Sequence, residues 1–551
     1  MKNITPLLFC FITLISNAQT AKIHKETISH KGKPKLIVGI MVDQMRWDYI
    51  NRFKPYFTSQ NGLNRFLNEG STCDNTLIPY VPTVTACGHA SVYTGSVPSI
   101  NGITGNNWFD NQKQKSVYCV EDESVQSIGV ENIASGKMSP ANLWTTTIGD
   151  EMKIASNFKS KVIGISIKDR GAILPAGHSA DGAFWYDSKT GYFISSSYYA
   201  PQLPTWVTAY NARHRPDSLY ALDWNLSLKK SIYEANCDND QNEYESTPLG
   251  KDQKGFPYNL HGFIGKDYSK ISSTPYGNTL VAELAQQAII NEKLGQDNIT
   301  DLLAVSFSSP DYIGHSFGPD SWETLDGYVK LDDLIAQLFT TLDKQVGKDN
   351  YTVFLTADHA VANIPGFAKK HKLPGGVVNE DQIKKGLSDF LMSKGLNGKL
   401  ISAVREYNVH FNHSLMDSLN INNDKLIALS AQYLEKLPEV LQVVDARNAT
   451  ASGLPQSLRE RIANGYNPQR AGDILIVTKS GYVDGFFTGT SHGVLYNYDA
   501  HIPLLLLGAG IKHGVINAPT YMTDIAPTIT TLLGIQMPSG AIGKPILEVL
   551  K

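Results

Sequence analysis

Short runs of apolar residues recur along the chain, and each is followed by polar or charged residues. The runs cover residues 35–42, 161–166, 301–307, 351–356, 473–478 and 503–507. Continuous apolar runs of this length are typical of strands that are buried on both faces, as in a parallel sheet. We therefore expect buried strands at these positions.

Amphipathic or breaker-free helical segments lie between several of these strands. Residues 280–290 contain good helix formers and no breaker, and residues 331–339 place apolar side chains at three- and four-residue spacing. Strands that alternate with helices indicate an α/β sandwich of three layers around a mostly parallel sheet. Ligands of such sheets bind at the carboxyl ends of the strands.

Two long stretches interrupt the alternation. Residues from about 176 to 275 are rich in Tyr, Trp, Ser, Asn and Pro, and their hydrophobic residues show little helical or strand periodicity. Residues from about 368 to 470 are richer in helical patterns. We interpret both as cap-like insertions in one catalytic domain that spans residues 35–551.

The N-terminus resembles a secretory signal peptide. Lys2 precedes an apolar run at residues 7–15, and small residues at 16–18 offer a cleavage site. No later apolar run reaches the roughly 18 residues of a membrane-spanning helix, so no stable membrane anchor is expected. These features predict a signal peptide at residues 1–18 and a periplasmic or secreted protein.

Four cysteines follow the signal peptide: Cys73, Cys87, Cys119 and Cys237. They form no CxxC pairs, so a cysteine zinc site is not indicated. An oxidising compartment allows a Cys73–Cys119 disulfide, although the sequence alone does not determine connectivity.

The composition is that of an ordinary folded protein. Of the 551 residues, 42% are hydrophobic and 18% charged, and the formal net charge is −3. No basic excess supports binding to a nucleic-acid polymer.

The first candidate for chemistry is Thr85, in the segment Tyr80-Val-Pro-Thr-Val-Thr-Ala-Cys-Gly-His89. Small residues follow the hydroxyl and then a helix-like run begins, so Thr85 is expected at a helix N-terminus, where an anion such as phosphate is favoured. A threonine hydroxyl needs a base or a metal to become a nucleophile. No Ser-His-Asp pattern surrounds Thr85, which directs attention to metal ligands elsewhere in the chain.

Three aspartates and three histidines lie after predicted strands or in loops. They are Asp43, Asp311, His315, Asp358, His359 and His492. Six such ligands divide into two three-ligand sites with open positions, which suits two catalytic Zn²⁺ ions. Two metals roughly 4 Å apart can clamp the attacking and leaving oxygens of an in-line displacement.

The motif Thr85-Ala-Cys-Gly-His89-Ala, the segment at residues 94–108 and the two Asp/His groups resemble the alkaline phosphatase superfamily. The chain is most similar to its periplasmic, phosphate-irrepressible PafA-type branch, which has a threonine nucleophile. The resemblance implies an alkaline-phosphatase-like fold and two zinc ions, one held by Asp311, His315 and His492 and the other by Asp43, Asp358 and His359. It also implies that Thr85 becomes phosphorylated and that Asn106 hydrogen-bonds a phosphoryl oxygen. Cys87 departs from the related diesterases, which usually have proline there.

Lys168 and Arg170, in the segment Ser166-Ile-Lys-Asp-Arg-Gly171, distinguish between branches of the superfamily. Two cations at the end of a predicted strand favour the dianion of a phosphate monoester over a diester. The resemblance assigns both residues to phosphoryl binding in the PafA-type branch and implies that the diesterases lack the pair.

We therefore expect a monomeric, secreted, zinc-dependent phosphomonoesterase that acts on small-molecule phosphate monoesters. A nucleotide pyrophosphatase or phosphodiesterase is the alternative enzyme. A sulfatase is less favoured, because neither Thr85 nor Cys87 stands in the Pro/Arg context of its modified Cys or Ser nucleophile. A non-catalytic metal- or phosphate-binding protein is the alternative outside enzymes, although all ten proposed positions carry competent residues.

Overall fold

The structure is a computed structural model that describes residues 33–131, 133–485 and 487–551. The predicted signal peptide at residues 1–18 lies outside the described residues. Residues Lys33–Lys551 form one compact unit, and the fold described below is the fold of this unit.

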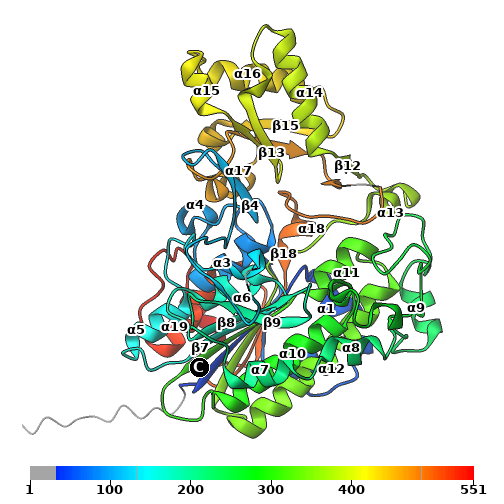
Figure 1. The fold of residues 1–551 in the computed structure, drawn as a ribbon, viewed down its shortest axis with the longest axis vertical. Helices are drawn as coiled ribbons and strands as arrows, with labels where there is room; N and C mark the ends of the chain where they lie inside the picture. The colour runs from blue at the N-terminus through cyan, green and yellow to red at the C-terminus, as the bar shows by residue number, and fades with distance from the viewer. Residues whose placement is uncertain (1–32, 132, 486) are drawn as a thin grey trace, which may run out of the picture. The chain divides into compact units, whose positions relative to one another are not determined.

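A ten-stranded sheet forms the centre of the unit (Figure 1). Its five middle strands are parallel, and antiparallel strands follow on both sides. In spatial order the strands are β20 (Gly514–Ile516), β2 (Ser71–Cys73), β19 (Leu504–Gly508), β11 (Tyr351–Thr356), β1 (Leu36–Val42), β10 (Asp301–Phe307), β7 (Val162–Ser166), β8 (Gly182–Asp187), β9 (Tyr192–Ser196) and β6 (Ser127–Ile128).

The apolar runs of the sequence form the middle of this sheet. Every residue of β1, β7, β10 and β11 is buried, which confirms the strands predicted at 35–42, 161–166, 301–307 and 351–356. The run at 503–507 forms β19, which pairs antiparallel with β11. A strand covered on both faces excludes water from its whole length, which is why its sequence shows no alternation.

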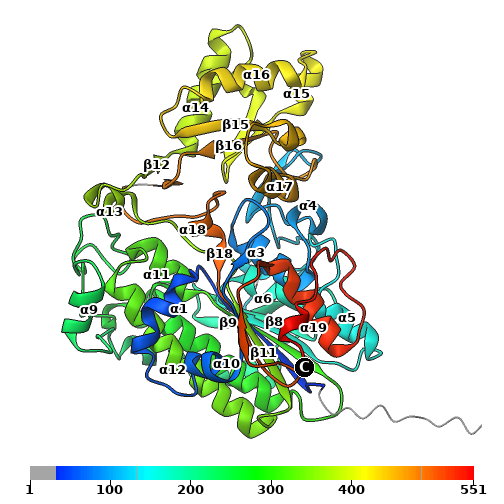
Figure 2. The same ribbon diagram turned by 180° about the vertical axis from the view of Figure 1, so that it is seen from behind.

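Helices cover both faces of the sheet, so the unit has three layers (Figures 1 and 2). The predicted helices at 280–290 and 331–339 lie within α10 and α12. One face carries α3 (Thr85–Thr94), α5 (Ile148–Ala155), α6 (Asp169–Ala176) and α19 (Ile525–Leu533). The other carries α1 (Asp48–Phe53), α10 (Tyr276–Asn291), α11 (Ser309–Phe317) and α12 (Trp322–Gln345).

A second module, residues 376–484, is called the cap below and lies at one end of the unit (Figures 1 and 2). It has its own hydrophobic cluster around an antiparallel sheet of order β13-β14-β16-β15. These strands are β13 (Ile401–Arg405), β14 (Asn408–Phe411), β16 (Ile474–Thr478) and β15 (Val440–Asp445), with α14 (Glu380–Ser393), α15 (His413–Ser418), α16 (Asn423–Leu434) and α17 (Gln456–Gly465).

The apolar run at 473–478 is therefore a strand, but it does not belong to the central sheet. It forms β16, between β14 and β15 of the cap, and both neighbours are antiparallel to it. A run of buried residues predicts burial on both faces and not the sheet to which the strand belongs.

The stretch at 176–275 also contains more regular structure than its composition indicates. It supplies β8 and β9 to the large sheet, and then α7 (Thr205–Asn211), α8 (Arg215–Tyr220) and α9 (Lys230–Asn236). The aromatic residues of β8 and β9 are mostly buried, which explains the high Tyr and Trp content. The boundaries of the two insertions stay predictions.

The four cysteines of the described residues are free thiols, so the Cys73–Cys119 disulfide considered above is not formed. Cys73 ends β2, and Cys119 lies just beyond β5 (Lys115–Tyr118) in a different part of the fold. No helix among residues 33–131, 133–485 and 487–551 is long and apolar enough to cross a membrane.

Candidate active site

Thr85 is the first residue of α3, as the sequence predicts. It is 1% exposed, and the helix that follows it is buried throughout. Gly88 allows this helix to approach the end of β11, because a Cβ at that position would lie 2.5 Å or less from three atoms of Asp358. The hydroxyl thus stands at a helix N-terminus, where the backbone favours an anion.

The predicted ligands meet at the carboxyl ends of neighbouring parallel strands. Asp43 follows β1, and Asp358 and His359 follow β11. Asp311 and His315 lie one turn apart on α11, directly after β10. The strand order β11-β1-β10 brings these residues together, and the loop that follows β17 (Tyr482–Asp484) adds His492.

Asp43, Asp358 and His359 form the first ligand group. The Nε2 atom of His359 is 3.5 Å from Asp43 Oδ1 and 3.6 Å from Asp358 Oδ2. All three atoms are buried and have no hydrogen-bond partner among the described residues, although His89 Nδ1 lies 3.3 Å from Asp358 Oδ2. A buried carboxylate oxygen or imidazole nitrogen without a hydrogen-bond partner is costly, and one shared divalent cation would satisfy all three atoms together.

Asp311 is the centre of the second group. Its Oδ1 lies 3.2 Å from His315 Nε2 and 3.7 Å from His492 Nε2. Asp311, His359 and His492 also lie close enough to share an ion, and the rings of His359 and His492 stack with centroids 3.5 Å apart. The two groups therefore adjoin, and the assignment of each histidine to one metal stays a prediction.

Backbone carbonyls orient all three histidines. The Nδ1 atoms of His315, His359 and His492 lie 2.7, 3.0 and 2.7 Å from the carbonyl oxygens of Thr490, Ala360 and Thr83. A ring that donates from Nδ1 leaves the lone pair of Nε2 free to bind a metal. A donor set of three carboxylates and three imidazoles, each with its Nδ1 directed at a backbone carbonyl, fits Zn²⁺.

Burial and neighbouring charges shift the pKa values of the candidate ligands in different directions. Burial raises the pKa of Asp43 well above its ordinary value, and Asp311 raises the pKa of His315 although burial opposes the charge of that ring. Burial lowers the pKa of His359 and, together with the other two histidines, lowers the pKa of His492 well below its ordinary value. Although burial opposes its charge, His315 and Lys168 hold the pKa of Asp311 below its usual range. Neutral imidazoles and an ionised carboxylate are the forms that bind metals.

Lys168 stands between the two ligand groups. It is the N-cap residue of α6, but its side chain extends into the site. Its Nζ lies 2.7 Å from Asp43 Oδ2, 2.6 Å from Asp311 Oδ2 and 3.4 Å from Thr85 Oγ1. Although burial disfavours its charge, Asp311 and Asp43 keep the pKa of Lys168 above its ordinary value. The ammonium group is therefore a permanent cation beside the threonine hydroxyl.

Arg170 approaches the same hydroxyl from the first turn of α6. Its Nη2 is 3.5 Å from Thr85 Oγ1, and its Nη1 donates to the hydroxyl of Tyr118 at 3.1 Å. Tyr118 in turn donates to Asp169 Oδ1 at 2.5 Å. This chain of bonds holds the guanidinium group in one orientation next to Thr85.

Asn106 completes the predicted set. It precedes β4 (Asn107–Asp110), and its Oδ1 accepts a hydrogen bond of 3.0 Å from the backbone N–H of Ala86. The side-chain amide is therefore attached directly to the first turn of α3. The structure thus brings together all ten residues that the sequence analysis selects.

Gln44, Tyr118 and Glu406 also serve this site and are not among the selected residues. Gln44 has a left-handed backbone, with φ of 66°, and bridges the groups by donating from its N–H to Asp358 Oδ1 (3.1 Å) and from Nε2 to Asp311 Oδ1 (2.7 Å). Its position next to Asp43 at the end of a strand is a signal that sequence inspection could use. Tyr118 and Glu406 carry no comparable signal.

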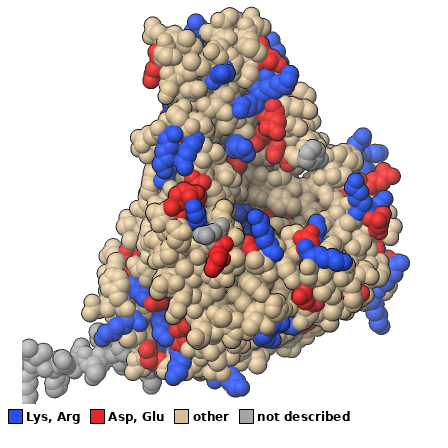
Figure 3. All heavy atoms as spheres, viewed as in Figure 1, with Lys and Arg blue, Asp and Glu red and all other residues tan. Residues whose placement is uncertain are grey.

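The surface near the site is hollowed below the cap (Figure 3). Lysine, arginine and acidic side chains stand around this hollow, so its rim carries both signs of charge. A separate cleft of about 530 Å³ lies between α17 and the C-terminal segment, and none of the ten selected residues lines it.

Comparisons with known proteins agree with this geometry. Residues 37–492 match the family model described as type I phosphodiesterase / nucleotide pyrophosphatase. The chain is 46% identical over 523 residues to alkaline phosphatase PafA of Elizabethkingia meningoseptica, covering 94% of this chain and 95% of that protein. It is 46% identical over 519 residues to alkaline phosphatase PhoV of Synechococcus elongatus, covering 94% and 93%. The crystal structure of wild-type PafA superposes with a TM-score of 0.91 at 45% identity, covering 94% of this chain and 99% of that one.

Proposed function

The chain belongs to the type I phosphodiesterase / nucleotide pyrophosphatase family and, within it, to the PafA-type alkaline phosphatases, and from this premise we propose that it is a zinc-dependent phosphomonoesterase that uses Thr85 as its nucleophile. Its substrates are small-molecule phosphate monoesters, and its products are inorganic phosphate and an alcohol or phenol.

One observation supports monoester chemistry above the others. Two cations, the buried Lys168 and the half-buried Arg170, reach Thr85 Oγ1 within 3.4 and 3.5 Å, and Asn106 is attached to the same helix turn. A monoester presents a dianion with three non-bridging oxygens, whereas a diester presents one negative charge. Two fixed cations therefore favour the monoester.

The six Asp and His residues would hold the metals: Asp43, Asp358 and His359 one ion, and Asp311, His315 and His492 the other. When bound, two zinc ions supply Lewis-acid activation of the hydroxyl and stabilisation of the departing oxygen. The identity and number of the ions are part of the proposal, and the donor set of three carboxylates and three imidazoles supports them.

Thr85, Lys168, Arg170 and Asn106 would carry out the substitution at phosphorus. The Thr85 hydroxyl gives up its proton and Oγ1 forms a bond to phosphorus as the bond to the ester oxygen breaks, and the leaving alcohol takes up one proton, so the number of protons is unchanged. Arg170 binds two non-bridging oxygens with its fork, Lys168 adds a point charge, and Asn106 donates a hydrogen bond. Water then hydrolyses the phosphothreonine, which releases phosphate and restores the hydroxyl.

The predicted signal peptide at residues 1–18 supports a periplasmic or secreted location, which is part of the proposal, as are the monomeric state and the lack of a nucleic-acid partner. The named family also includes diesterases, so a nucleotide pyrophosphatase or phosphodiesterase is the competing function.

The experiment compares turnover of an aryl phosphate monoester and the matching diester by the zinc-loaded protein and by Lys168→Ala/Arg170→Ala. We expect a strong monoester preference that collapses in the double variant. A diester preference that survives both substitutions would establish the competing function, and binding of phosphate without turnover of either ester would indicate a binding protein.

A further inference from the structure

The hairpin between β13 and β14 brings a carboxylate from the cap to the phosphoryl site. Arg405 pairs with Asn408, so Glu406 and Tyr407 are the two residues of a tight turn. Both have left-handed backbones, with φ of 49° and 63°, which is the conformation of a type I′ turn. Asparagine, aspartate or glycine usually occupies such positions. The left-handed backbone therefore costs conformational free energy at glutamate and tyrosine.

Neighbouring residues of the cap fix this turn in place. Glu380 Oε1 accepts a hydrogen bond of 2.6 Å from the backbone N–H of Tyr407, and Asn408 Nδ2 donates at 2.8 Å to the carbonyl oxygen of Glu406. The hydroxyl of Tyr407 accepts from the backbone N–H of Asp484 at 2.8 Å. The Glu406 side chain therefore extends from a rigid base.

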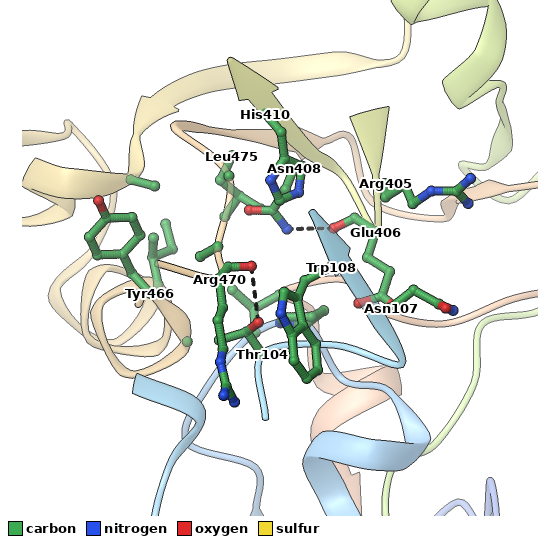
Figure 4. A pocket seen from close by; sticks show the side chains of 17 residues that line it. Thr104, Asn107, Trp108, Arg405, Glu406, Asn408, His410, Tyr466, Arg470 and Leu475 are labelled. Carbon is green, nitrogen blue, oxygen red and sulfur yellow. Dashed lines mark hydrogen bonds between the residues drawn. The ribbon is translucent and has the colours of Figure 1, made fainter. Parts of the chain in front are cut away.

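The side chain of Glu406 ends on the loop that carries Asn106. Its Oε1 accepts a hydrogen bond of 3.0 Å from the backbone N–H of Asn106, 300 residues away in the sequence. Its Oε2 lies against Gly105, where an added Cβ would be 2.2 Å from that oxygen. Figure 4 shows the side chain reaching from the hairpin toward neighbouring Asn107.

Asn106 is thus held at three atoms. The backbone N–H of Asn106 donates to Glu406, and the carbonyl oxygen of Asn106 accepts from the backbone N–H of Cys119 at 3.0 Å. Its Oδ1 atom accepts from the backbone N–H of Ala86. With Oδ1 turned toward the start of α3, Nδ2 is the part of the side chain left to donate to a phosphoryl oxygen. Glu406 supplies the constraint that comes from the cap.

We propose that Glu406 is a positioning residue of the phosphoryl site: it fixes the backbone of Asn106 so that the side-chain amide meets the transferred group. The inference rests on the proposed function, because it assumes that Asn106 binds a phosphoryl oxygen.

The charge of Glu406 is compatible with a phosphate dianion nearby. Burial raises the pKa of Glu406 to about 8. The hydrogen bond from Asn106 and the charge of Arg170 lower this pKa, whereas the charge of Glu380 raises it. A neutral carboxyl group still accepts the Asn106 bond through its carbonyl oxygen and does not repel the substrate.

The test uses two substitutions of similar size. Glu406→Gln keeps an oxygen acceptor, whereas Glu406→Met keeps the length of the side chain and removes the acceptor. We expect Glu406→Gln to retain kcat/KM for an aryl monoester within about threefold, and Glu406→Met to lose about ten- to a hundredfold, since small misplacements of a binding group have effects of this order. Arg405→Ala, an exposed neighbour on the same hairpin, is the matched control.

A double-mutant cycle identifies the route of the effect. Because Glu406 acts through Asn106, Glu406→Met should change kcat/KM less than about twofold in an Asn106→Ala background. The inhibition constant of inorganic phosphate should rise in Glu406→Met, with the thermal midpoint of each variant recorded alongside.

Equal losses in Glu406→Gln and Glu406→Met, or a Glu406→Met loss that is undiminished in the Asn106→Ala background, would overturn the inference. A wild-type protein that turns over no monoester would instead refute the proposed function. The two failures are therefore distinguishable in one set of assays.

Discussion

Replacing Arg170 with alanine should lower kcat/KM for an aryl phosphate monoester by about a hundred- to a thousandfold. Arg170 is half-buried beside the proposed nucleophile, with Nη2 at 3.5 Å from Thr85 Oγ1, and Tyr118 fixes the direction of its guanidinium group. Removing it leaves the phosphoryl dianion with one cation fewer in a site from which bulk water is largely excluded.

The magnitude follows from the geometry. Two unit charges about 4 Å apart interact by ~4 kcal/mol at an effective dielectric constant of ~20. Charge-assisted hydrogen bonds contribute about 1.5–3 kcal/mol. A loss of about 3–4 kcal/mol corresponds to the stated range, since each ~1.4 kcal/mol changes the rate tenfold.

The substrate dependence makes the test specific. A diester carries half the charge of a monoester dianion, so about half of this loss, or a fall in kcat/KM of about ten- to thirtyfold, is expected for the diester. The assay is steady-state release of the same phenol from both esters by zinc-loaded protein. Arg213→Ala, which removes an exposed arginine on the large domain, is the control. Equal losses for both esters, or a monoester loss below about threefold, would refute this account of Arg170.

Three further predictions follow from the same contacts. Gln44→Ala should weaken zinc affinity about ten- to a hundredfold in a competition titration with a chelator, because Gln44 bridges two metal carboxylates; unchanged affinity would contradict this. Tyr118→Phe should lower monoester kcat/KM about tenfold at an unchanged thermal midpoint, since Arg170 loses the hydroxyl group that accepts from its Nη1. An unchanged kcat/KM would show that this hydrogen bond is not needed to orient Arg170. The pKa values of Glu380 and Glu406 are raised by burial to about 7 and about 8, so the folded state keeps protons that the unfolded chain releases above roughly pH 4.5 and stability falls as pH rises toward 8. The drop in thermal midpoint between pH 6 and pH 9 should therefore be smaller in Glu380→Gln/Glu406→Gln than in the wild type, and an equal drop would be inconsistent with these shifts.

Most of the core and the ligand cluster are predictable from the sequence for one physical reason. Parallel strands converge at their carboxyl ends, so Asp43, Lys168, Asp311 and Asp358 could be placed together once their strands were recognised. Each lies within four residues of the end of a continuous apolar run, and a local motif marks Thr85. These inferences need no knowledge of long-range packing.

Contacts made through the cap and through turns are not predictable in this way. Glu406 meets Asn106 across 300 residues, and nothing in the local pattern of either segment names its partner. The apolar run at 473–478 correctly predicts a buried strand, β16, but this strand lies in the sheet of the cap and not in the central sheet. A strand buried on both faces has the same apolar sequence pattern in either sheet. Tyr118 acquires its role from pairing with Asn107 in the β4–β5 hairpin, which brings it to Arg170.

The most direct test of the account is to identify the residue that carries the phosphoryl group during turnover. Zinc-loaded protein is mixed with an aryl phosphate monoester, quenched in acid at a series of short times, digested and analysed by peptide mass spectrometry, with Thr85→Ala as the control. The account predicts one added phosphoryl group on Thr85 that disappears as substrate is exhausted, and none in the variant. A phosphoryl group on another side chain, or wild-type turnover by Thr85→Ala, would contradict it.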